Sequence, residues 1–426
     1  MLMSGVRPPF DVFDPKVYSR GIPHETYRRL RGEHPVHWQD EHEVDGWPAG
    51  PGFWAVTRYA DVVRVLRTPT EYSSWLGATQ IRDPAPEDLP FIRQMMLNLD
   101  PPAHGRLRRI VSRVFTPRRV ERFTADVAAR ARLLVDEIAE RGECDLPVDV
   151  TDEFPIQNLG DLLGIPAGDR AHILAWTNRV VGYQDPDHAT VVEGAGGGPV
   201  NPRSPAMLAD MFDYARRLAA DKRRSPTGDV MTALATAEVD GRRLTDPELS
   251  MFFFLLVIAG NDTVRSALPG GMIALLGHPD EHHRLLAHPH RLDSAIEEML
   301  RWHPPVLSFR RTAVVDTVLA GQPIAAGDKV VVFHGSANYD ERRFPDPLRF
   351  DITRNPNDHV SFGDGPHVCL GAHYARLQLR AFYREILWRL PDIELAGPPD
   401  RLVSNFIAGV KHLPVRYTPV PRLGAR

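Results

Sequence analysis

The spacing of apolar residues along the chain predicts a mainly helical protein. Between residues 103 and 141 apolar side chains recur every three or four positions, which places them on one face of a helix. The same spacing predicts helices over 169–183, 205–224 and 292–302, and a last long helix from about residue 371 to just before Pro391. Helices therefore account for most of the expected secondary structure.

The most apolar segment predicts a long buried helix over residues 246–277. A capping side chain, Thr245, precedes it, and Glu248 stands in its first turn, as is typical of a helix start. Residues 252–259 are apolar all round, so we expect this helix to lie inside the protein. Pro269 lacks the backbone N–H that a helix interior uses, and it predicts a kink there.

Strands are expected in two parts of the chain. The first hundred residues are rich in proline, glycine and aromatic residues with short β-type runs, and two or more strands are expected within 311–333. A glycine-rich stretch, 188–204, is typical of a mobile loop or lid. There is no internal repeat and no linker, so we predict one domain over 1–426, mainly α with a minor β portion, in which residues 1–20 are loosely ordered.

Composition and charge narrow the function classes. Apolar residues make up 43% of the chain, and 51 basic against 55 acidic residues give a net charge of −4, which argues against a nucleic-acid partner. The N-terminus lacks the apolar core of a signal peptide. The longest strongly apolar run, 251–259, is far shorter than the roughly 20 residues that span a bilayer. We therefore expect a cytoplasmic protein with no membrane anchor.

The sharpest chemical signal surrounds one of the two cysteines. Residues 362–371 read Phe-Gly-Asp-Gly-Pro-His-Val-Cys-Leu-Gly, and glycines permit the backbone turns that bring Cys369 to the start of the last helix. Free backbone N–H groups and the helix dipole there favour a thiolate, and Gly371 lets an N–H approach the sulfur. A buried structural thiol is the alternative for any lone cysteine, and it is our interpretation of Cys144.

A zinc site is a second alternative for this loop. Cys369 has His367 and His373 close in sequence, but the three residues do not have a standard zinc-ligand spacing. The loop instead resembles the haem-ligand loop of the cytochromes P-450, whose pattern is Phe-Gly-x-Gly-x-His-x-Cys-x-Gly followed by Ala-Arg. Every fixed position of that pattern is met by residues 362–376.

The resemblance implies a fold and a cofactor. It implies the single-domain cytochrome P-450 fold, with heme b (iron protoporphyrin IX) between the buried long helix and the helix that follows the cysteine loop. Cys369 would be the iron ligand, and its thiolate would push electron density toward the iron that activates dioxygen. Phe362 and Gly371 would be part of the haem-binding loop.

Residues 259–263, Ala-Gly-Asn-Asp-Thr, place polar groups inside the apolar helix. A buried carboxylate such as Asp262 is costly unless it is paired or functional, and Thr263 can bond back to a carbonyl one turn earlier. An ordinary pair between Asp262 and Arg265 is the alternative. The segment resembles the family's oxygen-activation motif, which implies that Thr263 and Asp262 deliver protons during catalysis.

Basic residues are expected around the two haem propionates. His104 and Arg108 stand four apart on one helix face, and surface charge is the alternative reading of both. They match a family pattern that implies contacts with the propionates. Arg311, preferred to its neighbour Arg310, and His367 occupy the other two positions, and arginine suits a carboxylate well.

Glu298 and Arg301 place opposite charges three residues apart on one helix face. By itself this spacing predicts an exposed ion pair. It matches the family's Glu-x-x-Arg motif, which implies a buried structural network near the cysteine side of the haem. Arg349 is our candidate for the third member of that network.

Electrons must come from other proteins, because the chain has no flavin or iron–sulfur motif of its own. The resemblance implies a bacterial-type protein served by a ferredoxin and a ferredoxin reductase. Arg109, Arg113 and Arg376 are expected around the cysteine side, where they either steer an acidic partner or are ordinary solvated arginines.

The substrate is expected to be an apolar small molecule: a steroid, a fatty acid or a terpenoid-like compound. Four mostly apolar segments are candidates for contact with it, namely 75–96, 257–263, 306–309 and 406–407. Residues 96–102 and 336–340 resemble the corresponding segments of an actinobacterial group that acts on sterols and methyl-branched lipids. Two alternatives remain open: the same haem centre in oxidative coupling or cyclisation, and a haem sensor without catalysis.

Overall fold

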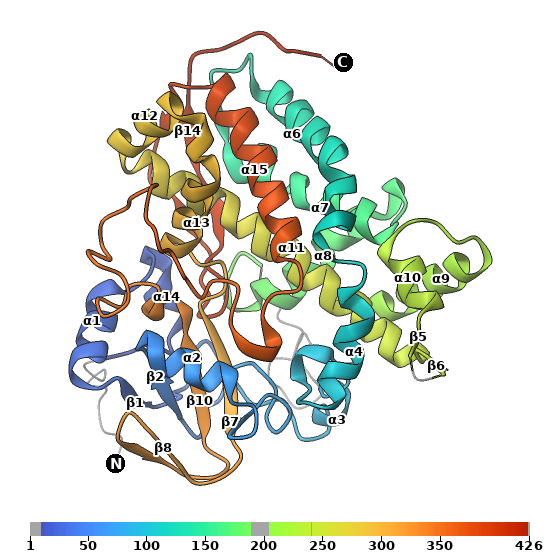
Figure 1. Ribbon diagram of the computed structural model, residues 1–426, viewed down its shortest axis with the longest axis vertical. Helices are drawn as coiled ribbons and strands as arrows, with labels where there is room; N and C mark the ends of the chain where they lie inside the picture. The colour runs from blue at the N-terminus through green and yellow to red at the C-terminus, as the bar shows by residue number, and fades with distance from the viewer. Residues whose placement is uncertain (1–9, 189–203, 240, 425–426) are drawn as a thin grey trace.

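A 31-residue helix, α11 (Asp246–Leu276), runs through the middle of the protein (Figure 1). The structure is a computed structural model that describes residues 10–188, 204–239 and 241–424. The helices that pack against α11 include α7 (Glu153–Leu163), α8 (Ala171–Val181), α9 (Ala209–Arg224), α13 (Leu292–Trp302) and α15 (Ala372–Arg389). This arrangement confirms the buried long helix that the sequence predicts.

The start of α11 follows the predicted capping pattern. The Thr245 side chain accepts from the backbone N–H of Glu248, and the Glu248 carboxylate accepts from the N–H of Thr245, so two otherwise unpaired donors are satisfied. Pro269 lies inside the helix and does not end it. Among the described residues α11 is the one helix long and apolar enough to cross a bilayer, and its burial among other helices is that of a core helix.

A five-stranded sheet forms the second part of the fold. Its order is β1 (Val36–Gln39), β2 (Phe53–Val56), β10 (Lys329–Phe333), β7 (Ser308–Ala313) and β3 (Tyr72–Ser73). Strands β2 and β10 run parallel, and the other pairs are antiparallel. The sheet therefore joins the first hundred residues to a segment more than two hundred residues later, as Figure 1 shows at the lower left.

Strand alternation gives the sheet two buried faces. Val331 and Phe333 of β10 pack into one apolar cluster with Phe53, while Val330 and Val332 pack into another. The same alternation separates the neighbouring arginines of β7. Arg310 pairs in register with Val331 and Arg311 with Val330, so the two guanidinium groups leave opposite faces of the sheet.

The remaining helices and strands complete the domain. The helices are α1 (His24–Glu33), α2 (Tyr59–Arg67), α3 (Leu89–Ile92), α4 (Ala103–Ser112), α5 (Pro117–Val120), α6 (Thr124–Ile138), α10 (Val230–Thr236), α12 (Pro279–Ala287) and α14 (His334–Ala337). The short strands are β4 (Glu143–Asp145), β5 (Glu238–Val239), β6 (Arg242–Arg243), β8 (Thr317–Leu319), β9 (Gln322–Ile324), β11 (Glu394–Leu395), β12 (Asp400–Arg401), β13 (Val410–His412) and β14 (Pro414–Arg416). The prediction of a mainly α protein with a minor β portion is confirmed.

Three expectations are corrected or fall outside the described residues. The predicted helix over 103–141 is broken into α4, α5 and α6, because Thr116 is extended before Pro117, which starts a new turn. Residues 10–20, expected to be loosely ordered, are packed: Phe10, Val12 and Phe13 are buried against the sheet. Most of the predicted glycine-rich loop, 189–203, lies outside the described residues.

Candidate active site

Cys369 lies at the end of a glycine-bent loop, directly before α15. Gly363 and Gly365 have φ of 69° and 67°, a conformation that favours glycine, and the Cys369 N–H donates to the Phe362 carbonyl at 2.8 Å. The backbone N–H of Gly371 donates to the sulfur, as expected from the sequence. This geometry presents Sγ at a fixed position with one donor behind it.

The thiol pKa departs from the sequence-based expectation. In the protein alone, burial raises the pKa of Cys369, and the Gly371 N–H with Arg108 and Arg376 offsets this only in part. The expectation of a lowered pKa was therefore wrong for the protein alone, since desolvation of the charged form outweighs the helix terminus. A bound metal cation is the kind of group that holds such a buried sulfur as thiolate.

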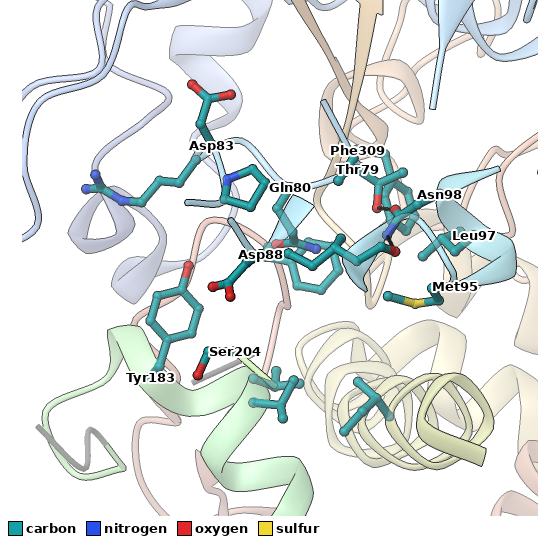
Figure 2. Close-up of a pocket in the computed structure, with 18 of the residues that line it drawn as sticks. Thr79, Gln80, Asp83, Asp88, Met95, Leu97, Asn98, Tyr183, Ser204 and Phe309 are labelled. Atoms are coloured by element: carbon teal, nitrogen blue, oxygen red, sulfur yellow. Dashed lines mark hydrogen bonds between the residues drawn. The ribbon is translucent and has the colours of Figure 1, made fainter. Parts of the chain in front are cut away.

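A cavity of about 780 Å³ lies against α11. Its wall is largely apolar and includes residues from all four segments that the sequence singled out (Figure 2). Representative members are Met95, Leu97, Ile258, Val306, Phe309 and Ile407. The volume and lining are those of a site for an apolar small molecule.

Sequence reasoning missed part of this wall. Glu41, the stretch 46–51, Val181 and Leu208 also line the cavity. Their segments carry no local pattern that distinguishes a cavity wall from ordinary core or loop. Only the packing of the N-terminal segments and of α8 and α9 against α11 brings these residues to the site.

Thr263 and Ala259 are next to each other on the cavity side of α11. The Thr263 hydroxyl donates to the Ala259 carbonyl at 2.7 Å, the back-bond that its position in a helix predicts. Ala259 is exposed although it lies in the middle of the most apolar helix, because it faces the cavity. A Cβ at Gly260 would come within 2.9 Å of Leu159, so this position lets α7 approach closely.

Asp262 lies beside Thr263 and is buried. The alternative pair with Arg265 is present only in part: Arg265 Nη1 is 3.7 Å from Asp262 Oδ1, whereas Arg265 Nε is 2.6 Å from Asp152. Arg265 also donates to Asn178 Oδ1 at 2.8 Å. The main ion pair of Arg265 is therefore with Asp152, and Asp262 takes a secondary position in that network.

Four basic side chains converge between α4, β7 and the cysteine loop. The rings of His104 and His367 are 4.1 Å apart, and Arg311 and Arg108 are close enough to act on His367. Burial and these three neighbours lower the pKa of His367 to about 2, and burial lowers the pKa of Arg311 to about 10. Both imidazoles are therefore neutral at pH 7, since burial also lowers the pKa of His104 to about 4, and the two arginines supply the positive charge that favours an anion here.

The residues present fit a haem. His104 Nε2 is buried without a hydrogen-bond partner, and Arg311, 3% exposed, makes its one described side-chain hydrogen bond to the Arg310 carbonyl. Two propionates would satisfy such donors. The Cys369 and Ala259 side chains are both accessible, although the protein atoms packed around the cysteine raise its pKa, so a flat group that binds between them would contact both. The sulfur completes a donor set typical of a haem thiolate.

Arg376 and Phe362 support the cysteine loop. The Arg376 guanidinium lies 4.4 Å from the centre of the Phe362 ring and forms two short bonds to the Glu297 carboxylate, at 2.6 and 2.7 Å. Glu297 also accepts from His359 at 3.2 Å. Because Arg376 is neutralised by Glu297, it does not add a free positive charge to the surface.

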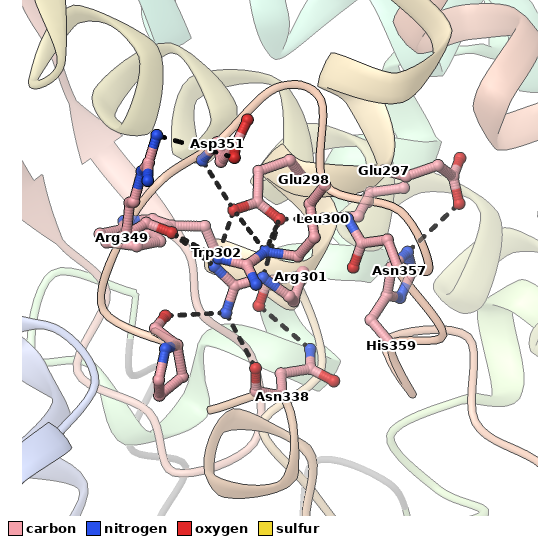
Figure 3. Close-up of polar contacts among 12 residues, drawn as sticks. Glu297, Glu298, Leu300, Arg301, Trp302, Asn338, Arg349, Asp351, Asn357 and His359 are labelled. Atoms are coloured by element: carbon pink, nitrogen blue, oxygen red, sulfur yellow. Dashed lines mark hydrogen bonds and ion pairs between the residues drawn. The ribbon is translucent and has the colours of Figure 1, made fainter. Parts of the chain in front are cut away.

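Glu298 and Arg301 form the buried network that the resemblance implies (Figure 3). Both side chains are fully buried and meet through two 2.8 Å bonds. The third member was predicted wrongly: Arg349 contributes its backbone carbonyl, and its guanidinium is 65% exposed. Arg354 takes this place, because its Nε lies 3.2 Å from Glu298 Oε2. The spacing alone could not show which arginine turns inward.

Cys144 has the structural character expected of it. It lies on β4 opposite Val415 of β14, and burial raises the pKa of its thiol to about 12. Such a thiol stays protonated and unreactive.

Comparison with known proteins agrees with this geometry. The family model for cytochrome P450 matches residues 206–391. A steroid C26-monooxygenase of Mycobacterium tuberculosis is 38% identical over 417 residues, 96% of this chain and 93% of its own length. A methyl-branched lipid omega-hydroxylase of the same species is 40% identical over 398 residues, 92% of this chain and 90% of its own length.

Solved structures show the same fold. A Mycobacterium marinum cytochrome P-450 in complex with pseudoionone superposes with a TM-score of 0.84 at 39% identity, covering 97% of this chain and 100% of that chain. A Bacillus megaterium protein in complex with testosterone gives a TM-score of 0.81 at 28% identity, covering 93% and 98%. The haem site and the fold define a haem-thiolate enzyme.

The chain belongs to the cytochrome P-450 family. It is an oxidoreductase of the monooxygenase type that contains haem b and works with apolar substrates, dioxygen and redox partners. When bound, the haem supplies activation of dioxygen at its iron.

Proposed function

We propose that the protein hydroxylates a steroid or a lipid-like small molecule. The observation that carries this proposal is the apolar cavity of about 780 Å³, whose wall includes Thr263 and Ala259 of α11. The relatives named as steroid C26-monooxygenase and methyl-branched lipid omega-hydroxylase support the same substrate class. A cavity of this size and lining accommodates one elongated apolar molecule.

In this proposal each haem-site residue has a stated role. Cys369 provides the iron ligand, and the Gly371 N–H tunes its sulfur. Phe362, in the same loop, supports the cysteine through its carbonyl, which accepts from the Cys369 N–H. The propionates are held by the four converging basic side chains, which are His104, Arg108, Arg311 and His367.

Asp262 and Thr263 supply protons in this proposal. Thr263 Oγ1 holds a proton at the cavity wall, where it now donates to Ala259. Asp262 is the adjacent carboxylate and also borders a small cavity of about 30 Å³ with Arg265 and Ser266, large enough for about one water. The two side chains thus connect the substrate cavity with a polar pocket behind α11.

In this proposal the protein lies in the cytoplasm and receives electrons from a ferredoxin, which a ferredoxin reductase reduces. Arg109 and Arg113 of α4 are exposed and border an open surface hollow with Arg108 and Pro366, next to the cysteine loop. Positive charge at this place suits an acidic electron donor. Arg376 does not join this surface because Glu297 neutralises it.

The test uses the purified holoprotein. We expect the reduced carbon-monoxide complex to show the absorption band that gives the family its name, and Cys369→His to lose it. Titration with steroids, fatty acids and terpenoids should give a substrate-type spectral shift with at least one class, followed by hydroxylated product when ferredoxin and reductase are added. A coupled or cyclised product would favour the alternative chemistry, and dioxygen use without any product would contradict the proposal.

A further inference from the structure

Arg82 places a guanidinium in the wall of the substrate cavity. It lies 5.1 Å from the centre of the Phe13 ring and 5.8 Å from that of Trp47, and its Nη1 donates to the Pro48 carbonyl at 2.8 Å. Two rings and a carbonyl therefore hold the group in place, as expected for a cation that stacks on aromatic faces. Burial lowers the pKa of Arg82, which remains a cation at neutral pH.

No carboxylate of the described residues pairs with Arg82. The nearby acids are already matched: Glu41 lies 2.6 Å from Lys329, and Asp83 lies 2.7 Å from Lys329 and 2.6 Å from Arg310. In this cluster two acids face two buried cations, so its formal charges cancel. Arg82 is then a fixed and partly desolvated positive charge in a largely apolar wall.

The cavity has a polar end and an apolar end. Figure 2 shows Asp83 and Tyr183 on one side and Met95, Leu97 and Phe309 on the other. Arg82 belongs to the polar end, because Tyr183 and Glu41 lie close enough to it to affect its pKa. Helix α11, whose Ile258 and Thr263 line the cavity, packs against residues 96–98 at the apolar end.

Asp88 is the opposing charge at the polar end. Figure 2 shows its carboxylate directed into the cavity, and burial with the neighbouring Glu87 raises its pKa. An amine on Asp88 would therefore compete with an anion on Arg82 as the charged end of a ligand. Arg82 is the better anchor because aromatic rings and a hydrogen bond already orient it, so less freedom is lost on binding.

We propose that Arg82 binds the anionic end of an elongated apolar substrate, which makes the substrate class a carboxylic acid of lipid or steroid type. This inference rests on the proposed function. A carboxylate on Arg82 gains charge-assisted hydrogen bonds from donors that the protein leaves available. The carbon chain then extends toward Thr263, so oxidation occurs at the end of the molecule remote from the carboxylate.

The experiment compares ligands that differ only at one end. Dodecanoate, dodecanol, methyl dodecanoate and dodecylamine are titrated into the ferric holoenzyme, with affinity measured by calorimetry and by the haem spectrum. We expect dodecanoate to bind roughly tenfold more tightly than dodecanol, as a charge-assisted bond in a partly desolvated site allows. Equal affinity of acid and alcohol, or tighter binding of the amine, would overturn the proposal.

Substitutions distinguish the effect of the Arg82 charge on binding from the effect of the rest of the cavity. Arg82→Gln should weaken dodecanoate by roughly tenfold and leave dodecanol within about twofold, and Asp88→Asn should tighten dodecanoate by about twofold. Arg93→Gln is the matched control: Arg93 also stacks on a tryptophan, Trp75, at 3.7 Å and donates to backbone carbonyls, but it does not line the cavity. Equal loss of acid and alcohol in Arg82→Gln would contradict the anchor.

Failure of the proposed function gives a different result. If dodecanoate binds through Arg82 but no hydroxylated product forms with any electron donor, the anionic subsite is supported and the monooxygenase proposal is wrong. If steroids are hydroxylated while no acid binds better than its alcohol, the proposed function is supported and the anchor is wrong.

Discussion

The hydroxyl of Thr263 donates to the carbonyl of Ala259 at 2.7 Å, one turn earlier on the central helix. In this bond the Thr263 hydroxyl proton points to a backbone carbonyl, and Oγ1 is kept at the wall of the substrate cavity. The hydroxyl thus has a fixed position at the cavity wall, and the carboxylate of Asp262 directly precedes it in the sequence.

Replacing Thr263 by alanine should uncouple electron use from product formation. Without the hydroxyl, proton supply at the cavity wall is lost, so we expect the share of electrons recovered in product to fall by roughly tenfold or more and hydrogen peroxide to rise. Thr263→Ser, which keeps the hydroxyl, should retain most of the coupling. Product and peroxide per electron pair are the measurements, and unchanged coupling in the alanine variant would exclude the proposed role.

The Glu298 network should respond in a graded way to loss of each arginine. Arg301→Ala leaves Glu298 buried without its main partner, so we expect a loss of about 3–5 kcal/mol in unfolding free energy and poor haem retention. Arg354→Ala removes a nearly buried contributor but leaves Glu298 its main partner, Arg301, and should cost about 1–2 kcal/mol. Arg349→Ala should change stability by less than about 0.5 kcal/mol. Thermal and urea unfolding test this order, and a large effect at Arg349 would contradict it.

His303 should make stability depend on pH. It is buried, its Nε2 is 2.8 Å from the Ala408 carbonyl, and burial lowers its pKa from 6.5 to about 4. Between these two values the unfolded chain binds the proton and the folded chain does not. The contribution is therefore complete above pH 6.5 and is lost as the pH falls toward 4, by about 1.4 kcal/mol per pH unit.

The variant His303→Gln tests this dependence. It should be less stable at pH 8, because a packed side chain is altered, but its stability should fall less steeply between pH 6.5 and 4. Urea unfolding of the holoprotein at several pH values gives both slopes. The same exchange at exposed His290 is the control and should keep the parent slope. Parallel curves for the parent and His303→Gln would disprove the assignment.

Charge reversal on α4 should affect electron transfer and little else. Arg109→Glu and Arg113→Glu should each raise the KM for ferredoxin several-fold at low salt, with a smaller effect at high salt, because the surface is exposed and screened. Substrate affinity should not change. Arg20→Glu, which reverses the charge of an exposed side chain in the N-terminal region, is the control. A salt-independent effect, or an equal effect at Arg20, would argue against docking at α4.

Some of the fold followed from local pattern alone. The helix over 292–302 has the predicted bounds, and α11 begins at the predicted cap and ends within one residue of the predicted end, because periodic apolar residues and capping side chains act over a few residues. The helices in the segment 103–141 were predicted less accurately. Its apolar spacing continues across Pro117, yet the extended backbone before that proline divides it into separate helices.

The haem-site residues divide in the same way. The Cys369 loop could be read from the sequence because its chemistry resides in one short run of residues, and the glycines in it have the backbone conformations that the run requires. The sequence could not show whether Arg349 or Arg354 contacts Glu298, because both arginines follow Glu298 by about the same distance along the chain. The turn that directs Arg354 inward depends on contacts with α13, far away in the sequence.

The sequence by itself determined the helix pattern, the haem-ligand loop and the polar pair in the buried helix, because each depends on neighbours a few residues away. The tertiary structure decided which cations are neutralised and which are not. Arg376 is paired with Glu297 and Arg310 with Asp83, whereas no carboxylate of the described residues forms an ion pair with Arg82 in the cavity wall. Electrostatic pairing acts through space over a few ångströms, and only the packed fold sets those distances.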